Sequence, residues 1–196
     1  MSALAAIRAE IEASASAKRE LAADTALLTL LAQLATECAS ALKAGGKIIF
    51  AGNGGSFADA QHLSAEFTSR FKHDRIPLAA IALGTNSSSM SAIGNDYGYE
   101  QVFVRELRAL GRPGDVFIAI TTSGNSPNIL TAVEASGGLG IRTVGLTGRS
   151  GGKLAGLCDC MRVPSDDTAR IQESHILLGH ILSGLIETAY FANGRL

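Results

Sequence analysis

The chain has no tryptophan and only three cysteines, Cys38, Cys158 and Cys160. An odd number of cysteines that includes a C-x-C pair fits neither a disulfide framework nor the ligand spacing of a zinc ribbon. Reduced thiols are the better interpretation, and they are typical of a cytoplasmic protein. The cysteines therefore argue against a disulfide-stabilised secreted domain.

Long charged or apolar runs are missing as well. Lys and Arg total 17 and Asp and Glu total 18, so no basic excess indicates nucleic-acid binding. The N-terminus carries charges of both signs and lacks the apolar core of a signal peptide. Because 18 apolar residues never follow one another, the sequence predicts no membrane-spanning helix. We expect one domain over residues 1–196, and its apolar content of 46% hints at burial in an oligomer.

Hydrophobic periodicity predicts a helical pair over residues 1–44 and an α/β core over residues 45–196. The pair comprises helices at about 3–22 and 25–43, with Asp24 as the N-cap of the second and glycine ending it. Short apolar segments then alternate with helices and predict strands at 47–52, 78–83, 114–121, 141–148 and 158–164. Further helices are expected at about 56–71, from 127 and at 168–190, while residues 86–110 are expected to form a loop and then a helix. This alternation indicates a parallel sheet that is covered on both faces.

Two segments of the core share one plan. "GKIIFAGNGGSFADA" and "GDVFIAITTSGNSPNILTA" each contain an apolar strand, a polar turn and the start of a helix. Ligands of open α/β sheets bind at the carboxyl ends of strands, where helix N-termini present free N–H groups to anions. If the two strands are neighbours, the two turns form one polar pocket.

The two turns differ in how strongly they indicate a ligand. "GNGGS" (52–56) matches neither the Walker A motif nor the dinucleotide fingerprint, and it fits a tight turn as well as a binding loop. "TTSGNS" (121–126) offers hydroxyl and N–H groups that can surround a phosphate. Ser126 also suits an N-cap before Pro127 at the first helical position. Since that role leaves Thr121, Thr122 and Ser123 unexplained, an anion or sugar site is favoured.

Three further segments carry polar residues of interest. His62 and Glu66, four residues apart, share a helix face and could be two ligands of one metal, a base and its partner, or a solvated pair. In "RIQESHILLGHIL", Gln172 and His180 are separated by roughly 12 Å along a regular helix, so they reach one ion only with converging side chains, a helix irregularity or a second subunit. "IGNDYGYE" (93–100) reads as a loop before the next helix.

Taken together, these motifs resemble one family. "GNGGSxADAQHxxxEF", "AIGNDYGYE", "TSGNSPNI", "LTGRSGGKLAG" and "RIQExHxxxGHI" are similar to the phosphoheptose isomerases of the sugar isomerase (SIS) domain superfamily. These enzymes convert sedoheptulose 7-phosphate to D-glycero-D-manno-heptose 7-phosphate, the first step of ADP- or GDP-heptose biosynthesis. The resemblance implies a five-stranded parallel sheet between helices, N-terminal helices that pack an oligomer, a homotetramer with active sites near subunit interfaces, and one Zn²⁺ per subunit.

The resemblance also implies roles for individual residues. The implied zinc ligands are His62, Glu66, Gln172 and His180. The implied substrate-binding residues are Asn53, Gly54, Gly55, Ser56, Glu66, Asn95, Asp96, Thr121, Thr122, Ser123, Gly124, Ser126 and Gln172. Asp59, one turn before His62, could orient that histidine through a hydrogen bond. The chain departs from common family residues at Phe57, which could narrow the pocket mouth or pack under it, and at Ala169, where Asp166 or Asp167 could substitute for an acid.

Glu66 and His180 are the predicted acid/base pair. Ketose–aldose isomerisation moves a proton between C1 and C2 through an enediol, which requires acid/base groups and stabilisation of charge on the substrate oxygens. Zinc could hold the pair in place or polarise a carbonyl. Two alternatives stay open: a non-catalytic SIS protein that binds the bacterial replication initiator, which has no chemical need for Glu66 and His180, and an SIS isomerase or sensor of another sugar phosphate.

Overall fold

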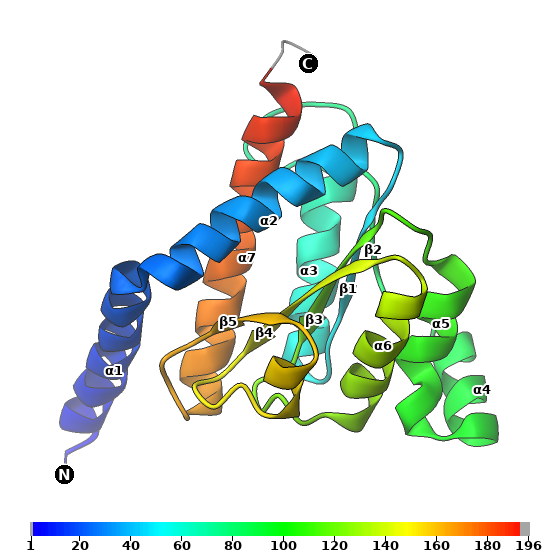
Figure 1. The fold of residues 1–196 in the computed structure, drawn as a ribbon. Coiled ribbons are helices and arrows are strands. Elements are labelled where there is room, and N and C mark those ends of the chain that lie inside the picture. Colours follow the sequence, from blue (N-terminus) through cyan, green and yellow to red (C-terminus); the bar gives the residue numbers. More distant parts are fainter. Residues whose placement is uncertain (1, 193–196) are drawn as a thin grey trace.

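The computed structural model describes residues 2–192 and shows a five-stranded parallel sheet between helices, as predicted (Figure 1). The strand order is β2-β1-β3-β4-β5. The strands are β1 (Ile48–Ala51), β2 (Ala80–Ala82), β3 (Val116–Ile120), β4 (Arg142–Thr147) and β5 (Asp159–Arg162). Each strand is shorter at both ends than the predicted apolar segment, because burial continues beyond the paired backbone: Leu78 and Leu83 flank β2 and are 3% and 0% exposed.

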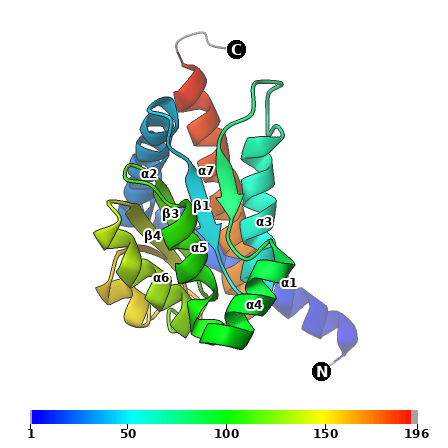
Figure 2. The same ribbon diagram turned by 90° about the vertical axis from the view of Figure 1, so that its right-hand side faces the viewer.

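Helices cover both faces of this sheet (Figures 1 and 2). The helices are α1 (Ala3–Ala23), α2 (Thr25–Lys43), α3 (Gly55–Thr68), α4 (Ser87–Tyr97), α5 (Val102–Leu110), α6 (Pro127–Gly138) and α7 (Thr168–Phe191), with the 3₁₀ turns η1 (Tyr99–Gln101) and η2 (Lys153–Gly156). Apolar side chains of α2, α3 and α7 form one core, and those of α5 and α6 form the other. The first layer contains both helices that carry the predicted metal ligands.

Alternation along the strands divides the apolar residues between the two cores. In β1, Ile48 and Phe50 face the α2, α3 and α7 side, whereas Ile49 and Ala51 face the α5 and α6 side. Since both faces of the sheet are buried, successive residues of a central strand are all apolar. This is why the predicted strands read as continuous apolar runs.

The N-terminal helical pair has the predicted boundaries. Asp24 accepts a hydrogen bond from the Leu27 N–H at 3.0 Å and so caps α2, which ends at Lys43 and is followed by the C-cap Ala44 and by Gly45 with φ +86°. By length and mean hydropathy α2 could cross a membrane, but here its apolar face packs against α7 and the sheet. In contrast, α1 extends away from the sheet (Figure 1) and buries only Ala17 and Leu21.

The prediction of a loop after residue 86 is wrong for residues 87–97. The structure has helix α4 there, because the Asn86 side chain accepts a hydrogen bond from the Ser89 N–H and Gly98, with φ +91°, ends the helix. A serine-rich segment has weak helix propensity, so the cap and the packing of α4 on α5 and η1 decide its structure. The predicted helix at 56–71 likewise ends early, at Thr68.

Asp166 and Asp167, the two acids before α7, have different roles at its start. Asp167 is the N-cap and accepts hydrogen bonds from the N–H groups of Ala169 and Arg170, while Asp166 pairs with Arg149 at 3.2 Å. An N-cap carboxylate satisfies N–H groups that have no partner inside the helix. Asp167 therefore fixes where α7 starts, and with it the placement of the residues that follow.

Candidate active site

The two polar turns lie side by side at the carboxyl edge of the sheet. β1 and β3 are parallel neighbours, and they flank the point at which the strand order reverses. Ligands of open α/β sheets bind at such switch points. Asn53 and Asn128 join the turns through two side-chain hydrogen bonds of 2.9 Å, and the Tyr99 hydroxyl donates to Asn53 Oδ1 at 3.2 Å. Neither Asn128 nor Tyr99 was predicted, because nothing in the sequence pairs Asn53 with either.

The turn after β3 has the properties of an anion loop. Ser126 precedes Pro127 at the first position of α6, but its hydroxyl bonds the Thr121 hydroxyl at 2.9 Å instead of capping the helix. Within residues 2–192, the N–H groups of Thr122, Ser123 and Ser126 have no hydrogen-bond partner. Free N–H groups at a helix N-terminus are donors for a bound anion.

Glycines let the chain approach this loop closely. A Cβ on Gly124, whose φ is +67°, would lie 2.0 Å from the Gly151 carbonyl oxygen. The Lys153 N–H donates to Asn125 Oδ1 at 3.0 Å, so the segment that follows β4 braces the loop. The loop is therefore held by its neighbours while some of its own N–H groups stay free.

Helices α3 and α7 run side by side in the same direction. At their start, Gly55 faces Gln172, whose amide would lie 2.6 Å from a Cβ on the glycine. Further along, Gly179 faces Leu63, and a Cβ on Gly179 would lie 2.5 Å from a Leu63 methyl. Two glycines thus allow the helices to approach more closely than larger residues would. Gly179 immediately precedes His180, so this close approach sets the position of the histidine.

The close approach brings His62, Glu66 and His180 together, and we refer to these three residues as the cluster. His62 Nε2 lies 3.0 Å from Glu66 Oε1, His180 Nε2 lies 3.3 Å from His62 Nε2, and His180 Nε2 lies 3.7 Å from Glu66 Oε1. The Phe71 ring stacks on His180 with centroids 5.6 Å apart. The helix spacing in the sequence placed His62 beside Glu66, whereas His180 joins them from 118 residues away.

The geometry of the cluster fits a tetrahedral metal ion. The three donor atoms lie within 4.8 Å of one another. Bonds of about 2.0–2.1 Å to zinc place neighbouring ligand atoms about 3.4 Å apart, and the three separations of the cluster bracket this value. Two imidazole nitrogens and one carboxylate oxygen are also a donor set that zinc accepts, with a fourth position left for water or substrate.

Gln172 and Asp59 do not join the cluster through hydrogen bonds. The Gln172 amide lies at Gly55, and in the described part of the chain it makes no hydrogen bond to His62, Glu66 or His180. The suggested hydrogen bond from Asp59 to His62 is absent there too, and Asp59 Oδ2 is buried without a partner. Burial raises the pKa of the Asp59 carboxyl, which the nearby His62 opposes. Asp59 is therefore near His62 but makes no hydrogen bond to it in the described residues.

Asn95 and Asp96 lie on α4, away from the cluster. Both side chains are exposed, bond each other at 2.8 Å and line an open cavity of about 570 Å³ with Ser87, Ser88, Ser91 and Ala92. Within residues 2–192, no hydrogen bond links them to the two turns or to the cluster. Tyr99, just beyond α4, connects this part of the chain to Asn53 through its hydroxyl.

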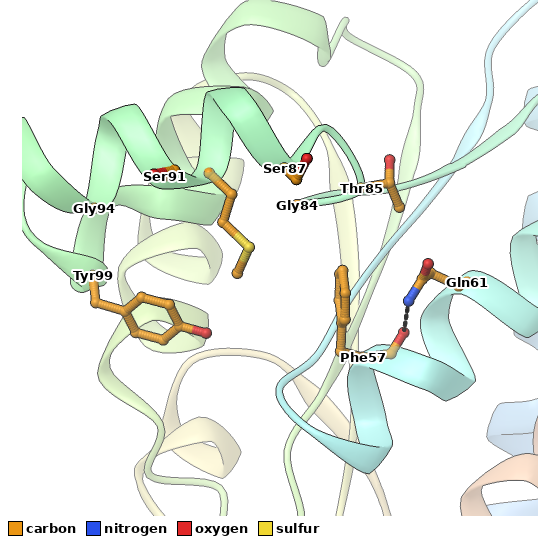
Figure 3. Close-up of a pocket in the computed structure, with 9 residues that line it drawn as sticks. Phe57, Gln61, Gly84, Thr85, Ser87, Ser91, Gly94 and Tyr99 are labelled. Atoms are coloured by element: carbon orange, nitrogen blue, oxygen red, sulfur yellow. Dashed lines mark hydrogen bonds between the residues drawn. The ribbon is translucent and has the colours of Figure 1, made fainter.

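Phe57 lines a second cavity, between α3 and α4. This cavity of about 450 Å³ is bounded by Phe57, Gln61, Gly84, Thr85, Ser87, Met90, Ser91, Gly94 and Tyr99 (Figure 3). Phe57 and Tyr99 lie on opposite sides of it, and Phe57 packs against Gly84, where a Cβ would lie 3.2 Å from its ring. Phe57 therefore forms one wall of a largely apolar recess next to the GNGGS turn.

His175 lies beneath the site rather than in it. It is 1% exposed, its Nε2 lies 3.2 Å from the Thr147 carbonyl oxygen, and its Nδ1 has no partner in residues 2–192. Burial lowers the pKa of His175 to about 4, and the hydrogen bond to Thr147 opposes this shift. The residue is therefore a neutral part of the core at neutral pH.

A parallel sheet with polar turns at its switch point and a hydroxyl-rich loop at a helix N-terminus form the kind of site at which open α/β folds bind anions. Residues 9–148 match the SIS domain family; this segment is more than two thirds of the chain and includes both turns, His62 and Glu66. The site is thus that of a SIS-domain protein.

Close relatives narrow this class. A phosphoheptose isomerase of Aneurinibacillus thermoaerophilus is 53% identical over 188 residues, or 95% of either chain. The structure of phosphoheptose isomerase GmhA from Neisseria gonorrhoeae matches with a TM-score of 0.89 and 43% identity, covering 95% of this chain and 100% of that one. A phosphoheptose isomerase from Francisella tularensis matches with a TM-score of 0.91 and 41% identity over 96% and 100% of the two chains. The chain therefore belongs to the phosphoheptose isomerase family of SIS-domain proteins.

The contact at Gly179 gives a first prediction. Gly179→Ala places a methyl against Leu63 and pushes α7 away from α3, which overpacking data suggest costs about 1–3 kcal/mol of unfolding free energy. Because His180 moves with α7, any affinity of the cluster for a divalent metal ion should fall as well, as measured with Zn²⁺ by competition with a chromogenic chelator. Gly137→Ala is the matched control, since a Cβ there meets nothing within 4 Å. Unchanged zinc affinity in Gly179→Ala would contradict the proposed spacing.

The buried His175 gives a second prediction. Its pKa is lower in the folded chain than in the unfolded one, so the unfolded state binds more protons between about pH 6.5 and 4. The contribution of the neutral His175 to the free energy of unfolding is therefore fully present above pH 6.5, and it falls by about 3 kcal/mol as the pH approaches 4. In urea titrations over this range, His175→Gln should show a shallower pH dependence than the wild type. His73→Gln, at an exposed position, should match the wild type. An equally steep loss in His175→Gln would refute the assignment.

Proposed function

We propose that the chain isomerises sedoheptulose 7-phosphate to D-glycero-D-manno-heptose 7-phosphate by proton transfer through an enediol, as the first step of ADP- or GDP-heptose biosynthesis. The observation that carries this proposal is the convergence of His62, Glu66 and His180, two of which lie on the helix that begins at the end of the GNGGS turn. Relatives named phosphoheptose isomerase support it, at 53% and 52% identity.

Glu66 and His180 serve as the acid/base pair. One group removes the proton from C1 of the ketose while the C2 oxygen gains a proton, and the enediol is then protonated at C2 as the O1 proton leaves. Because the reverse reaction retraces these steps, each group acts as acid in one direction and as base in the other. Glu66 Oε1 faces both imidazoles, which leaves Oε2 for proton transfer.

The substrate spans from the anion loop to the cluster. The phosphate is bound by the hydroxyl groups of Thr121, Thr122, Ser123 and Ser126 and by the free N–H groups of the last three. The sugar hydroxyls are bound by Asn53, Gly54, Gly55, Ser56, Asn95, Asp96 and Gln172. The two turns meet through the Asn53–Asn128 pair, which supports one continuous polar surface. Asn95 and Asp96 lie apart from this surface in a single chain, and we propose that they act where subunits meet.

One Zn²⁺ per subunit is held by His62, Glu66 and His180, with Gln172 as the fourth ligand of the proposed set. Such an ion would polarise substrate oxygens and so stabilise negative charge that develops on them. The tetrahedral spacing of the cluster supports its three members. Gln172 would complete the set only by turning from its place at Gly55 or by reaching the ion of another subunit.

The subunits form a homotetramer in the cytoplasm, without nucleic-acid or membrane partners. The exposed apolar side chains of α1 support this assembly: Leu4, Ile7 and Ile11 are 70%, 54% and 64% exposed and share one helix face. Exposed apolar stripes of this kind mark protein–protein contacts. In this arrangement residues 1–44 are an oligomer-packing pair attached to a single α/β domain.

Glu66→Gln tests the chemistry. Replacing the carboxylate with an amide removes an acid/base group, so kcat for sedoheptulose 7-phosphate should fall by about 10²–10⁴-fold. The exposed Glu134→Gln on α6 is the matched control and should keep full activity. Full activity in Glu66→Gln would refute the role, and preferred turnover of a hexose or pentose phosphate by the wild type would favour another SIS isomerase. Folded wild type without any isomerase activity would favour the non-catalytic initiator-binding alternative.

A second variant tests the assembly. Ile7→Glu combined with Ile11→Glu places two charges in the apolar stripe and should shift the mass in light scattering from four subunits toward smaller species. Ala6→Glu adds a charge to the opposite, exposed side of α1 and should leave the mass unchanged. A wild type that is monomeric at micromolar concentration would overturn the tetramer.

A further inference from the structure

Arg75, between α3 and β2, is a buried arginine that the reaction does not use directly. Its side chain is 1% exposed, which is rare for a charged residue without strong partners. Its guanidinium donates to five oxygens: Glu187 Oε1 at 2.8 Å, and the carbonyl oxygens of Phe67 at 2.8 Å, Ser69 at 3.2 Å, Ile76 at 3.1 Å and Glu66 at 2.7 Å. Nearly every donor of the side chain is therefore engaged.

Three of these bonds end on the last turn of α3. The carbonyls of Glu66, Phe67 and Ser69 lie where a helix has no partners of its own, and a cation there is favoured by the helix dipole. Arg75 therefore caps α3. The cap includes the backbone of Glu66, whose carboxylate belongs to the cluster.

Another hydrogen bond of the Arg75 guanidinium connects it to α7. Glu187 is 2% exposed and accepts hydrogen bonds from Arg75 Nε and, at 3.0 Å, from the Lys72 N–H. It lies seven residues after His180, which is about two turns of helix, so both side chains project from the same side of α7. One guanidinium thus connects the backbone of Glu66 to the helix that carries His180.

We propose that Arg75 is a positioning residue of this active site: by joining the end of α3 to α7 through Glu187, it fixes the Glu66 carboxylate relative to the His180 imidazole. The inference rests on the proposed function for its effect on turnover, and on the cluster alone for its effect on ion binding. The separation that it controls is the 3.7 Å between His180 Nε2 and Glu66 Oε1. A lysine cannot replace it, because an ammonium group lacks the planar fork that reaches the carboxylate and the carbonyls together.

The test compares Arg75→Lys and Glu187→Gln with a control at a separate buried carboxylate, just before β3. Asp115 is 1% exposed and accepts from Lys47 Nζ at 2.6 Å, the Lys47 N–H at 2.9 Å and the Arg112 N–H at 2.8 Å. Asp115→Asn therefore disturbs a buried carboxylate, whose lysine partner is 25% exposed, at the amino edge of β1 and β3. Each variant is assayed as the full chain, at a temperature where circular dichroism shows it folded.

Two readouts separate positioning from general stability. In Arg75→Lys we expect kcat for sedoheptulose 7-phosphate and the affinity for Zn²⁺ each to fall by about 10- to 100-fold, with KM little changed. Glu187→Gln should also lower kcat and the affinity for Zn²⁺. If Arg75→Lys does not fold, the result with Glu187→Gln decides whether the ion pair positions the cluster. Asp115→Asn should lower the urea midpoint while kcat and zinc affinity stay at the wild-type values.

Two results would overturn the inference. One is a folded Arg75→Lys or Glu187→Gln chain with wild-type kcat and zinc affinity. The other is an Asp115→Asn chain that loses both as strongly, since the losses would then follow stability alone. If the wild type does not turn over sedoheptulose 7-phosphate, the proposed function fails, and the zinc affinities of the same variants still decide whether Arg75 positions the cluster.

Discussion

The close packing of α3 on α7 is the constraint on which the site depends. Gly55 and Gly179 permit the approach, and the Arg75–Glu187 pair holds the far end of the two helices together. Because interiors are packed as densely as crystals, a shift of either helix moves every side chain between them. The position of His180 relative to Glu66 therefore follows from small residues and one buried ion pair, and not from the cluster itself.

The sheet contributes a second, independent part of the candidate site. Its strand order places the turns after β1 and β3 next to each other, and the free N–H groups of the second turn suit a phosphate. In the proposed mechanism the helices supply the groups that move protons, and the turns supply the groups that hold the charged end of a sugar phosphate. Binding energy from a phosphate far from the reacting carbons can orient those carbons, which is how a small site gains rate.

Much of the fold and part of the candidate site could be predicted from the sequence, for a physical reason. Strands buried on both faces leave continuous apolar runs, and a helix places residues four apart on one side, so the five strands and the His62–Glu66 pair were predictable. Contacts over long sequence distances were not: the family resemblance suggested His180, but neither the Asn53–Asn128 pair nor Arg75 leaves a local pattern. Helix α4 was missed because its stability comes from a cap and tertiary packing, which outweigh the low propensity of its serines.

The coordination of zinc tests the central claim most directly. The purified chain, loaded with one equivalent of Zn²⁺, would be examined by X-ray absorption at the zinc edge. The arrangement of His62, Glu66 and His180 predicts two imidazole ligands and oxygen ligands at about 2.0–2.2 Å, with the imidazole signal reduced in His180→Gln. A sulfur shell at about 2.3 Å, which would indicate Cys158 and Cys160 instead, or a shell without imidazole, would contradict the account.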